Sequence, residues 1–365
     1  MSSVDALQFA IPTLQSAIWI AVNCKLQIAK CKLQIGMAAW GCLVLASVLM
    51  GRFSLAEEPK QSVLVVVGAA GSDEFAPQFR DWAEKWHLAA QHGQAEFAAI
   101  GLDDAQQSPD RLALSDRLAA WAGPATQPAW LVLIGHGTFD GKTARFNLRG
   151  DDVSADELAK WLAGVERPLA IVNCTSSSGP FLASLAGPSR VVIAATRSGH
   201  EVNFARFGEH MAASIGDLSA DLDKDEQTSL LEAFLAASAK TREFYASEGR
   251  LATEHSLLDD NGDTLGTPGD WFQGVRATKS AKDGTALDGT LAGQFVLARS
   301  IREQQMPEAV RIRRDELEQQ LAELRKRKTT LPEKEYLKLL EPVLVELARL
   351  YHTDDAKAPL SGQGE

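Results

Sequence analysis

The stretch LVLIGHGTFDG, residues 131–141, begins as an unbroken apolar run and ends in a histidine between two glycines. A second stretch, LAIVNCTSSSG at residues 169–179, begins in the same way and reaches Cys174. Apolar runs without alternation are typical of parallel strands that are buried on both faces. His136 and Cys174 therefore each follow a predicted strand, which raises the question of whether they are partners in one site.

Other apolar runs of this kind extend the predicted sheet. They lie at residues 62–72, 95–102 and 190–196, and a short extended piece lies at 144–150. Segments with helical spacing lie between and after these runs, at residues 75–93, 110–123, 154–165 and about 203–215. Strands that alternate with helices predict an α/β fold, with a mainly parallel sheet and helices on both faces. In such folds the ligand site lies beyond the carboxyl ends of the strands, where His136 and Cys174 are expected.

The N-terminal region has the pattern of a leader. Residues 38–50 are an apolar segment with the length of a signal-peptide core, and small residues precede position 57. We expect residues 1–56 to be removed after Ala56, which predicts a periplasmic or extracellular protein with no membrane anchor in its mature form. An uncleaved anchor is the alternative, and Met37 as the true start is a further hypothesis.

Charge and cysteine usage narrow the class of partner. The formal net charge is −11, which argues against a nucleic-acid partner. Cys174 is the only cysteine after residue 56, so it has no partner for an internal disulfide. It is therefore either a small buried core residue or a functional thiol.

The two strand ends together offer the parts of an acyl-transfer site. A thiolate is a good nucleophile, and a nearby histidine accepts its proton or forms an ion pair with it. The backbone N–H groups of Gly137 and Cys174 are candidate donors to an oxyanion. The alternative for His136 is a surface histidine in a tight turn, and the alternative for Cys174 is packing.

These motifs resemble those of legumain-type cysteine peptidases, which have the caspase–haemoglobinase fold. In that family a histidine followed by glycine comes after one strand, and the cysteine comes after the next. VVVGAAGSDEFAPQFR (65–80) and VVIAATRSGHEV (191–202) also resemble family segments, and the resemblance covers about residues 61–215, extending at most to 275. It implies a caspase-like three-layer sandwich.

The resemblance also implies an activity and roles for individual residues. It implies an exported cysteine endopeptidase that acts on proteins or peptides through an acyl-enzyme, without a catalytic cofactor. Cys174 would be the nucleophile and His136 its base or ion-pair partner, while Arg80 and Glu201 would line the substrate pocket. The sequence departs from the family pattern at Asn173 and in the spacing of Gly179 from the cysteine.

A separate acidic motif predicts a calcium site. DLDKDEQTSLLE (221–232) has the spacing of an EF-hand loop, followed by a predicted helix over about 229–248. The expected ligands are Asp221, Asp223, Asp225, Gln227 through its carbonyl, Ser229 and Glu232. Glu226 occupies the sixth position, where glycine is usual. The alternative is an acidic helix N-terminus that binds no ion.

A second acidic stretch begins with the same spacing. DDNGDTLGTPGD (259–270) carries Asp259, Asn261 and Asp263, but Pro268 and Gly269 prevent a normal exit helix. A turn-rich loop is the preferred interpretation. Ion binding and cleavage during maturation remain open for this stretch.

The C-terminal region differs in composition from the predicted peptidase domain at residues 57–275. Residues 276–300 are expected to form a linker, and residues 301–365 a helical hairpin with a tail. The hairpin breaks at 328–332, Pro342 bends its second helix, and each helix has an apolar side. These sides carry Val310, Leu317, Leu321 and Leu324, and then Leu337, Leu340, Leu344 and Leu347. The hairpin is expected to cover the site as an inhibitory segment or to bind a partner.

Three functions remain open on the sequence alone. The first is the cysteine endopeptidase. The second is a catalytically inactive, calcium-binding module on the same caspase-like scaffold. The third is a thiol hydrolase or transferase that acts on small acyl substrates.

Overall fold

The computed structural model describes residues 60–103, 108–282 and 285–355. Its main sheet has seven strands in the order β10-β9-β8-β7-β3-β1-β2. Five of them run parallel: β1 (Ser62–Val67), β2 (Glu96–Ile100), β3 (Ala129–Ile134), β7 (Leu169–Asn173) and β8 (Arg190–Ala194). The five apolar runs of the sequence therefore form the predicted parallel strands.

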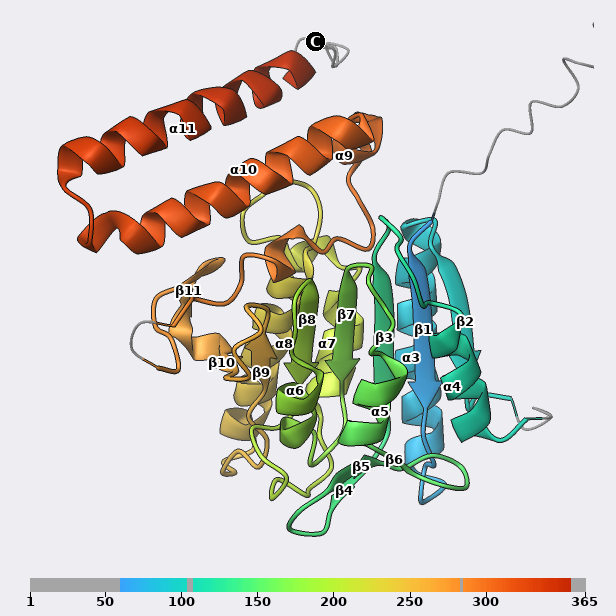
Figure 1. The fold of residues 1–365 in the computed structure, drawn as a ribbon. Coiled ribbons are helices and arrows are strands. Elements are labelled where there is room, and N and C mark those ends of the chain that lie inside the picture. The colour runs from blue at the N-terminus through green and yellow to red at the C-terminus, as the bar shows by residue number, and fades with distance from the viewer. Residues whose placement is uncertain (1–59, 104–107, 283–284, 356–365) are drawn as a thin grey trace, which may run out of the picture. The chain divides into compact units, whose positions relative to one another are not determined.

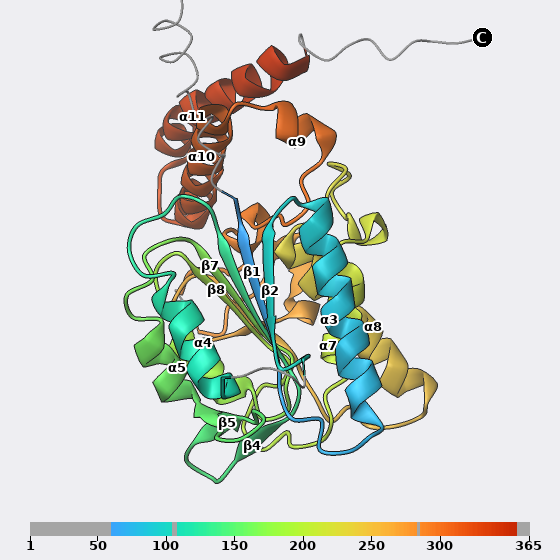
Figure 2. The ribbon, with the colours of Figure 1, turned by 90° about the vertical axis from the view of Figure 1, so that its right-hand side faces the viewer.

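Helices cover both faces of this sheet (Figure 1). One face packs against α3 (Phe75–His92), α7 (Phe207–Ser214) and α8 (Leu230–Ser247), and the other against α4 (Asp110–Ala119), α5 (Ala155–Trp161) and α6 (Gly179–Leu185). Figure 2 shows α3, α7 and α8 on one side of the strands and α4 and α5 on the other. The predicted three-layer α/β sandwich is thus confirmed.

Strand alternation explains why two separate cores form. In β3, Trp130, Val132 and Ile134 face α3 and α7, whereas Leu131 and Leu133 face the opposite helices. All six residues of this strand are buried. Because both faces need apolar side chains, the sequence reads as a continuous apolar run rather than an alternating one.

Short antiparallel strands extend the main sheet beyond β8, and others follow the carboxyl end of β3. β9 (Leu257–Asp259) pairs antiparallel with β8, and β10 (Thr267–Pro268) follows it at the edge. A separate three-stranded sheet follows β3 directly, formed by β4 (Gly137–Phe139), β5 (Ala144–Phe146) and β6 (Val153–Ser154). A two-stranded ribbon, β11 (Phe272–Gln273) and β12 (Arg276–Ala277), precedes the C-terminal region.

Reciprocal capping boxes fix the start of α5 and α8. Ser154 begins α5 and Ser229 begins α8, each in a reciprocal capping box with the glutamate three residues later. Such a box satisfies two backbone N–H groups that the helix itself leaves without partners. In α8 the partner is Glu232, so this predicted calcium ligand also has a helix-capping role.

The predicted linker at 276–300 needs a correction, because part of it belongs to the core. Ala292, Phe295 and Leu297 are buried in the same cluster as α3 and α7. The Phe295 ring packs edge-on against Trp130, with 5.6 Å between centroids. Gln61 donates from Nε2 to the carbonyls of Val296 and Leu297 at 3.0 and 3.3 Å.

The predicted hairpin forms, and its helices pack against each other. It follows α9 (Ile301–Gln305) and consists of α10 (Glu308–Lys326), a 3-10 turn at Arg327–Thr329, and α11 (Glu333–Asp355). The shared cluster contains Leu317, Leu321, Val343 and Leu347. Leu337 and Leu344 are exposed instead, because residues 340, 343, 347 and 350 form the stripe that faces α10. The predicted phase of the second helix was therefore partly wrong.

The predicted leader over 1–56 and the tail after 355 lie outside the described residues. Within the part of the chain that the structure describes, none of the helices has both the length and the apolar character needed to cross a bilayer.

Candidate functional site

The topology brings the His136 and Cys174 segments together, because β3 and β7 are adjacent parallel strands. Leu133 pairs with Asn173, and the Cys174 N–H donates to the Leu133 carbonyl at 2.9 Å. Ile134 and Cys174 are buried in the same cluster, on the α3 and α7 face. The predicted placement at neighbouring strand ends is therefore present, and the His136 ring packs against Phe75 and Phe79 of α3, on the same face of the sheet as Cys174.

The His136 imidazole lies in an aromatic cage. Its ring centroid is 4.9 Å from that of Phe75, 5.3 Å from Phe79 and 5.9 Å from Phe204. Its Nε2 lies 3.0 Å from the Ala70 carbonyl oxygen. A carbonyl only accepts, so Nε2 is the donor in this arrangement.

Cys174 is a buried, free thiol with 1% of its surface exposed. The helix α7 approaches it closely at Gly208. A β-carbon added at Gly208 would lie 2.7 Å from the Cys174 β-carbon and 2.6 Å from the Trp82 ring. Burial raises the pKa of the thiol far above its ordinary range, and the nearby charge of Glu254 raises it further. The thiol is therefore protonated and enclosed, as expected of a packing residue.

The two predicted oxyanion donors are already engaged within the fold, which corrects that expectation for this conformation. The Cys174 N–H belongs to the strand ladder described above. The Gly137 N–H donates to Ser176 Oγ at 3.2 Å. A β-carbon at Gly137 would lie only 2.1 Å from the Ser176 carbonyl oxygen, so glycine is required there for close packing.

The serine run after Cys174 builds the loop that closes this edge, a role that the sequence analysis missed. Ser176 Oγ also donates to the Gly137 carbonyl at 3.1 Å. Ser177 has a left-handed backbone (φ +55°), its N–H donates to the Glu201 carbonyl at 2.9 Å, and its hydroxyl is buried without a partner among the described residues. Ser178 and Thr196 share a hydrogen bond of 3.1 Å between their hydroxyls. The sequence feature that could have indicated this loop is the run of three serines before Gly179.

The predicted pocket residues have separate surroundings. Glu201 Oε1 lies 2.6 Å from His255 Nδ1 and 3.1 Å from Arg197 Nε, and its Oε2 accepts from the backbone of both residues. Glu201 thus holds the 197–201 loop against the segment that leads into β9. Arg80 is exposed on α3, and no hydrogen bond or ion pair of the described residues joins it to Glu201.

The sequence analysis also missed a role for Glu254, which is buried. Its carboxylate accepts from the N–H groups of Arg206 and Phe207 at 2.8 and 3.0 Å, at the start of α7. The Tyr245 hydroxyl donates to it at 3.1 Å. Burial raises the pKa of Glu254. This acid positions the helix end that packs against Cys174.

The 221–232 loop gathers the first three predicted calcium ligands. Ligand atoms of Asp221, Asp223 and Asp225 all lie within 4.8 Å of one another. Glu226, in the sixth position, has the left-handed backbone (φ +69°) that normally calls for glycine there. Burial, followed by the neighbouring carboxylates, raises the pKa of Asp223 to about 6. This concentration of negative charge would be relieved by a cation.

The remaining predicted ligands hold the loop in shape. Glu232 accepts from the N–H of Leu222 at 2.7 Å and from that of Ser229 at 2.8 Å. The Gln227 side chain donates to Asp225 at 2.8 Å and accepts from the Ser300 N–H at 3.2 Å. Glu232 and Ser229 therefore serve the helix cap, and Gln227 ties the loop to the start of α9.

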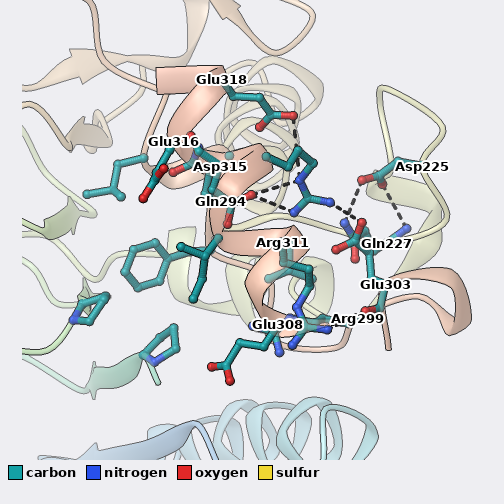
Figure 3. A pocket seen from close by; sticks show the side chains of 18 of the residues that line it. Asp225, Gln227, Gln294, Arg299, Glu303, Glu308, Arg311, Asp315, Glu316 and Glu318 are labelled. Carbon is teal, nitrogen blue, oxygen red and sulfur yellow. Dashed lines mark hydrogen bonds and ion pairs between the residues drawn. The ribbon is translucent and has the colours of Figure 1, made fainter. Parts of the chain in front are cut away.

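A charged cavity of about 550 Å³ lies between the amino edge of the sheet and the hairpin. Figure 3 shows acidic and basic side chains facing one another there, among them Asp225, Glu303, Arg311 and Glu318. Gln127, just before β3, donates to Glu308 of α10 at 2.9 Å. The hairpin therefore packs at the opposite edge from His136, and the expectation that it covers the site is corrected.

Comparisons with known proteins give a distant likeness in fold. No family model matches the chain, and no curated protein matches it either. Similar solved structures include the Drosophila initiator caspase Dronc, at 11% identity and a TM-score of 0.38, which covers 55% of this chain and 79% of that one. Caspase-1 from Spodoptera frugiperda is 8% identical with a TM-score of 0.36, over 55% of this chain and 86% of that one. Raptor from Chaetomium thermophilum is 9% identical with a TM-score of 0.29, over 44% of this chain and 18% of that one. A likeness at this level carries no conclusion about activity.

Proposed function

We propose that this chain is a calcium-stabilised module that binds a protein or peptide at the carboxyl edge of its sheet and does not hydrolyse it. The observation that carries this proposal is the enclosure of Cys174. Its thiol is buried, its pKa is raised, and α7 packs on it through Gly208. A cysteine nucleophile needs access to substrate and a thiolate within reach, and neither condition is met in this arrangement.

The hydrogen bonds around the cysteine support the same conclusion. The backbone donors of Gly137 and Cys174 are used by Ser176 and Leu133. Stabilisation of an oxyanion requires donors that are free and directed at the reacting oxygen. The carboxyl edge is therefore closed by its own serine loop.

The edge still presents side chains to a ligand. Phe139 of β4 packs edge-on against His200, with 5.1 Å between ring centroids, and His136 is partly exposed. His200 and Arg197 are exposed on the loop that Glu201 holds in place. A protein or peptide is the ligand class that the resemblance to cysteine peptidases implies, and we propose it for this edge.

Calcium is proposed as the structural ion at Asp221, Asp223 and Asp225. Hard oxygen ligands in this spacing suit Ca²⁺, and the three ligand atoms already lie close together. The ion would neutralise the cluster and would also steady Gln227, which accepts from Ser300 at the start of α9.

A cysteine endopeptidase, exported after removal of the leader, is the second candidate. It is favoured by one observation, the placement of His136 and Cys174 after adjacent parallel strands and on one face. It requires α7 or the serine loop to move so that the thiol is exposed.

A peptidyl acyloxymethyl ketone probe, added with and without CaCl₂, separates the two candidates. The module predicts a calcium-dependent rise in melting temperature with no labelling of Cys174 in the native protein. Labelling of Cys174 in wild type that is lost in the variant His136→Ala would establish the peptidase instead. Denatured protein, in which the thiol is exposed, serves as the positive control for alkylation.

A further inference from the structure

The loop between β9 and β10 repeats the construction of the 221–232 loop, although its sequence lacks the exit helix of an EF-hand. Asp259, Asn261 and Asp263 occupy the first, third and fifth positions. Left-handed residues occur at the same two positions in both loops. They are Lys224 (φ +66°) and Glu226 (φ +69°) in the first loop, and Gly262 (φ +76°) and Thr264 (φ +68°) in the second.

The internal hydrogen bonds of the two loops also correspond. The residue in the fourth position donates its N–H to the first aspartate, Lys224 to Asp221 at 2.6 Å and Gly262 to Asp259 at 2.8 Å. The residue in the seventh position donates to the fifth, at 3.2 Å in the first loop and at 2.8 Å from Leu265 to Asp263 in the second. The two backbones therefore follow the same path through the ligand positions.

A carboxylate from a distant segment replaces the last ligand position. In the first loop Glu232 accepts from the N–H groups of the second and third residues, at 2.7 and 3.3 Å. In the second loop Asp288 accepts from the corresponding groups, those of Asp260 and Asn261, at 3.0 and 3.3 Å. Asp288 thus takes the place of Glu232, and its other oxygen accepts from the Thr267 hydroxyl.

An independent observation points to a missing ligand. Asp259 is only 1% exposed, and its Oδ2 is buried without a hydrogen-bond partner among the residues that the structure describes. A buried carboxylate oxygen without a donor is costly unless a cation meets it. Neighbouring acids increase the cost of a negative charge on Asp259, because Asp260, Asp263 and Asp288 interact with it.

Asn261 is oriented for the same ligand. Its Nδ2 donates to the Ala286 carbonyl at 2.9 Å, so its Oδ1 remains on the loop side, where it accepts from the Asp263 N–H at 2.8 Å. Amide and carboxylate oxygens in this arrangement are hard ligands of the kind that Ca²⁺ takes.

We propose that the 259–265 loop is a second calcium site, in which Asp259, Asn261, Asp263 and Asp288 supply side-chain oxygens and Leu265 its carbonyl. The ion would join the edge strands β9 and β10 to the 285–292 segment. Asp260 already fastens that segment by accepting from the N–H groups of Gly289 and Ala292 at 2.9 and 2.8 Å. The inference is independent of the proposed binding activity and of whether the first loop is occupied.

Calcium stoichiometry of the full chain, measured by equilibrium dialysis with ⁴⁵Ca²⁺ and by native mass spectrometry, tests the proposal. Wild type is expected to bind two ions, and Asp263→Asn and Asp223→Asn one each. Asparagine keeps an oxygen acceptor at each position, so the ion-free fold is retained, which the melting temperature in EDTA checks. Asp270→Asn, an exposed acid outside the proposed ligands, is the matched control and should bind two ions.

The measured stoichiometries distinguish the absence of the second site from the absence of the first. If wild type binds one ion and Asp263→Asn still binds one, the second site is refuted and the ion belongs to the first loop. If Asp263→Asn abolishes the one bound ion while Asp223→Asn retains it, the second site stands and the first is lost. Asp288→Asn should weaken binding without affecting the first loop, and unchanged stoichiometry and affinity in this variant would remove Asp288 from the site.

Discussion

The carboxyl edge of the sheet and the two acidic loops differ in how far the protein satisfies its own polar groups. At the edge, the Gly137 and Cys174 N–H groups have internal partners, and the thiol is packed away under α7. In the first loop, ligand oxygens of Asp221, Asp223 and Asp225 lie within 4.8 Å of one another, and in the second loop one Asp259 oxygen has no partner among the described residues. The expected catalytic centre is therefore closed, whereas the loops have the unsatisfied oxygens that a ligand would complete.

Removal of calcium should have the largest effect. A ligand at about 100 times its Kd stabilises the native state by about 2.7 kcal/mol per site. Loss of two ions should therefore lower Tm by about 10 °C in a chain of this size. Differential scanning calorimetry in CaCl₂ and in EDTA measures this shift, with MgCl₂ as the control for ionic strength. Equal Tm values in calcium and EDTA would mean that the loops are ordinary turns.

The stabilising effect of calcium should depend on pH, because protons and the ion compete for the same carboxylates. Burial raises the pKa of Asp259 to about 6 and that of Asp288 to about 8. In EDTA the native state holds these protons more tightly than the unfolded chain, so stability should fall as pH rises through about 4 to 8, by at most about 3 kcal/mol for Asp259.

Calcium competes with those protons, so its stabilising effect should grow over the same pH interval. The difference between Tm in CaCl₂ and in EDTA should therefore widen from about pH 5 to about pH 8. A difference that stays constant with pH would show that the bound ion does not contact these carboxylates.

Gly137→Ala probes the closed edge. The added β-carbon would lie 2.1 Å from the Ser176 carbonyl oxygen, and overpacking of this kind costs about 1–3 kcal/mol. Gly164→Ala is the matched control, since its β-carbon would meet only Ala122 at 3.6 Å. Chemical denaturation of both variants measures the cost. Equal stability of the two would mean that the serine loop is open in solution.

Cys174→Ala probes the packing role directly. Removal of one buried sulfur should destabilise the fold by about 1 kcal/mol, through lost burial and the cavity that remains. Cys174→Ser should cost more, because it places a hydroxyl in an apolar site. The free energy of unfolding in urea measures both. Serine and alanine variants that are as stable as wild type would argue that the thiol is not part of the core.

The sequence was informative wherever the determinant was local. The apolar runs that end at Ile134 and Asn173 predicted the strands, and the spacing of Asp221, Asp223 and Asp225 predicted their convergence. Glu226 was identified as the misfit of that loop, and its left-handed backbone explains why.

The determinants that escaped prediction are tertiary. The enclosure of Cys174 depends on the approach of Gly208 from a helix 34 residues further along the chain, and Asp288 reaches its loop from 28 residues away. The position of the hairpin at the amino edge depends on contacts such as that between Gln127 and Glu308. No local pattern specifies such pairings, because they arise only when separate elements pack.

Alkylation of Cys174 by iodoacetamide, followed between about pH 6 and about pH 10 in wild type and in His136→Ala, tests the central claim most directly. The account predicts slow alkylation of the native protein that rises only on unfolding and is the same in both proteins. A fast-reacting thiol with a pKa below its ordinary value of about 8.5, lost in His136→Ala, would contradict the account and establish a catalytic dyad.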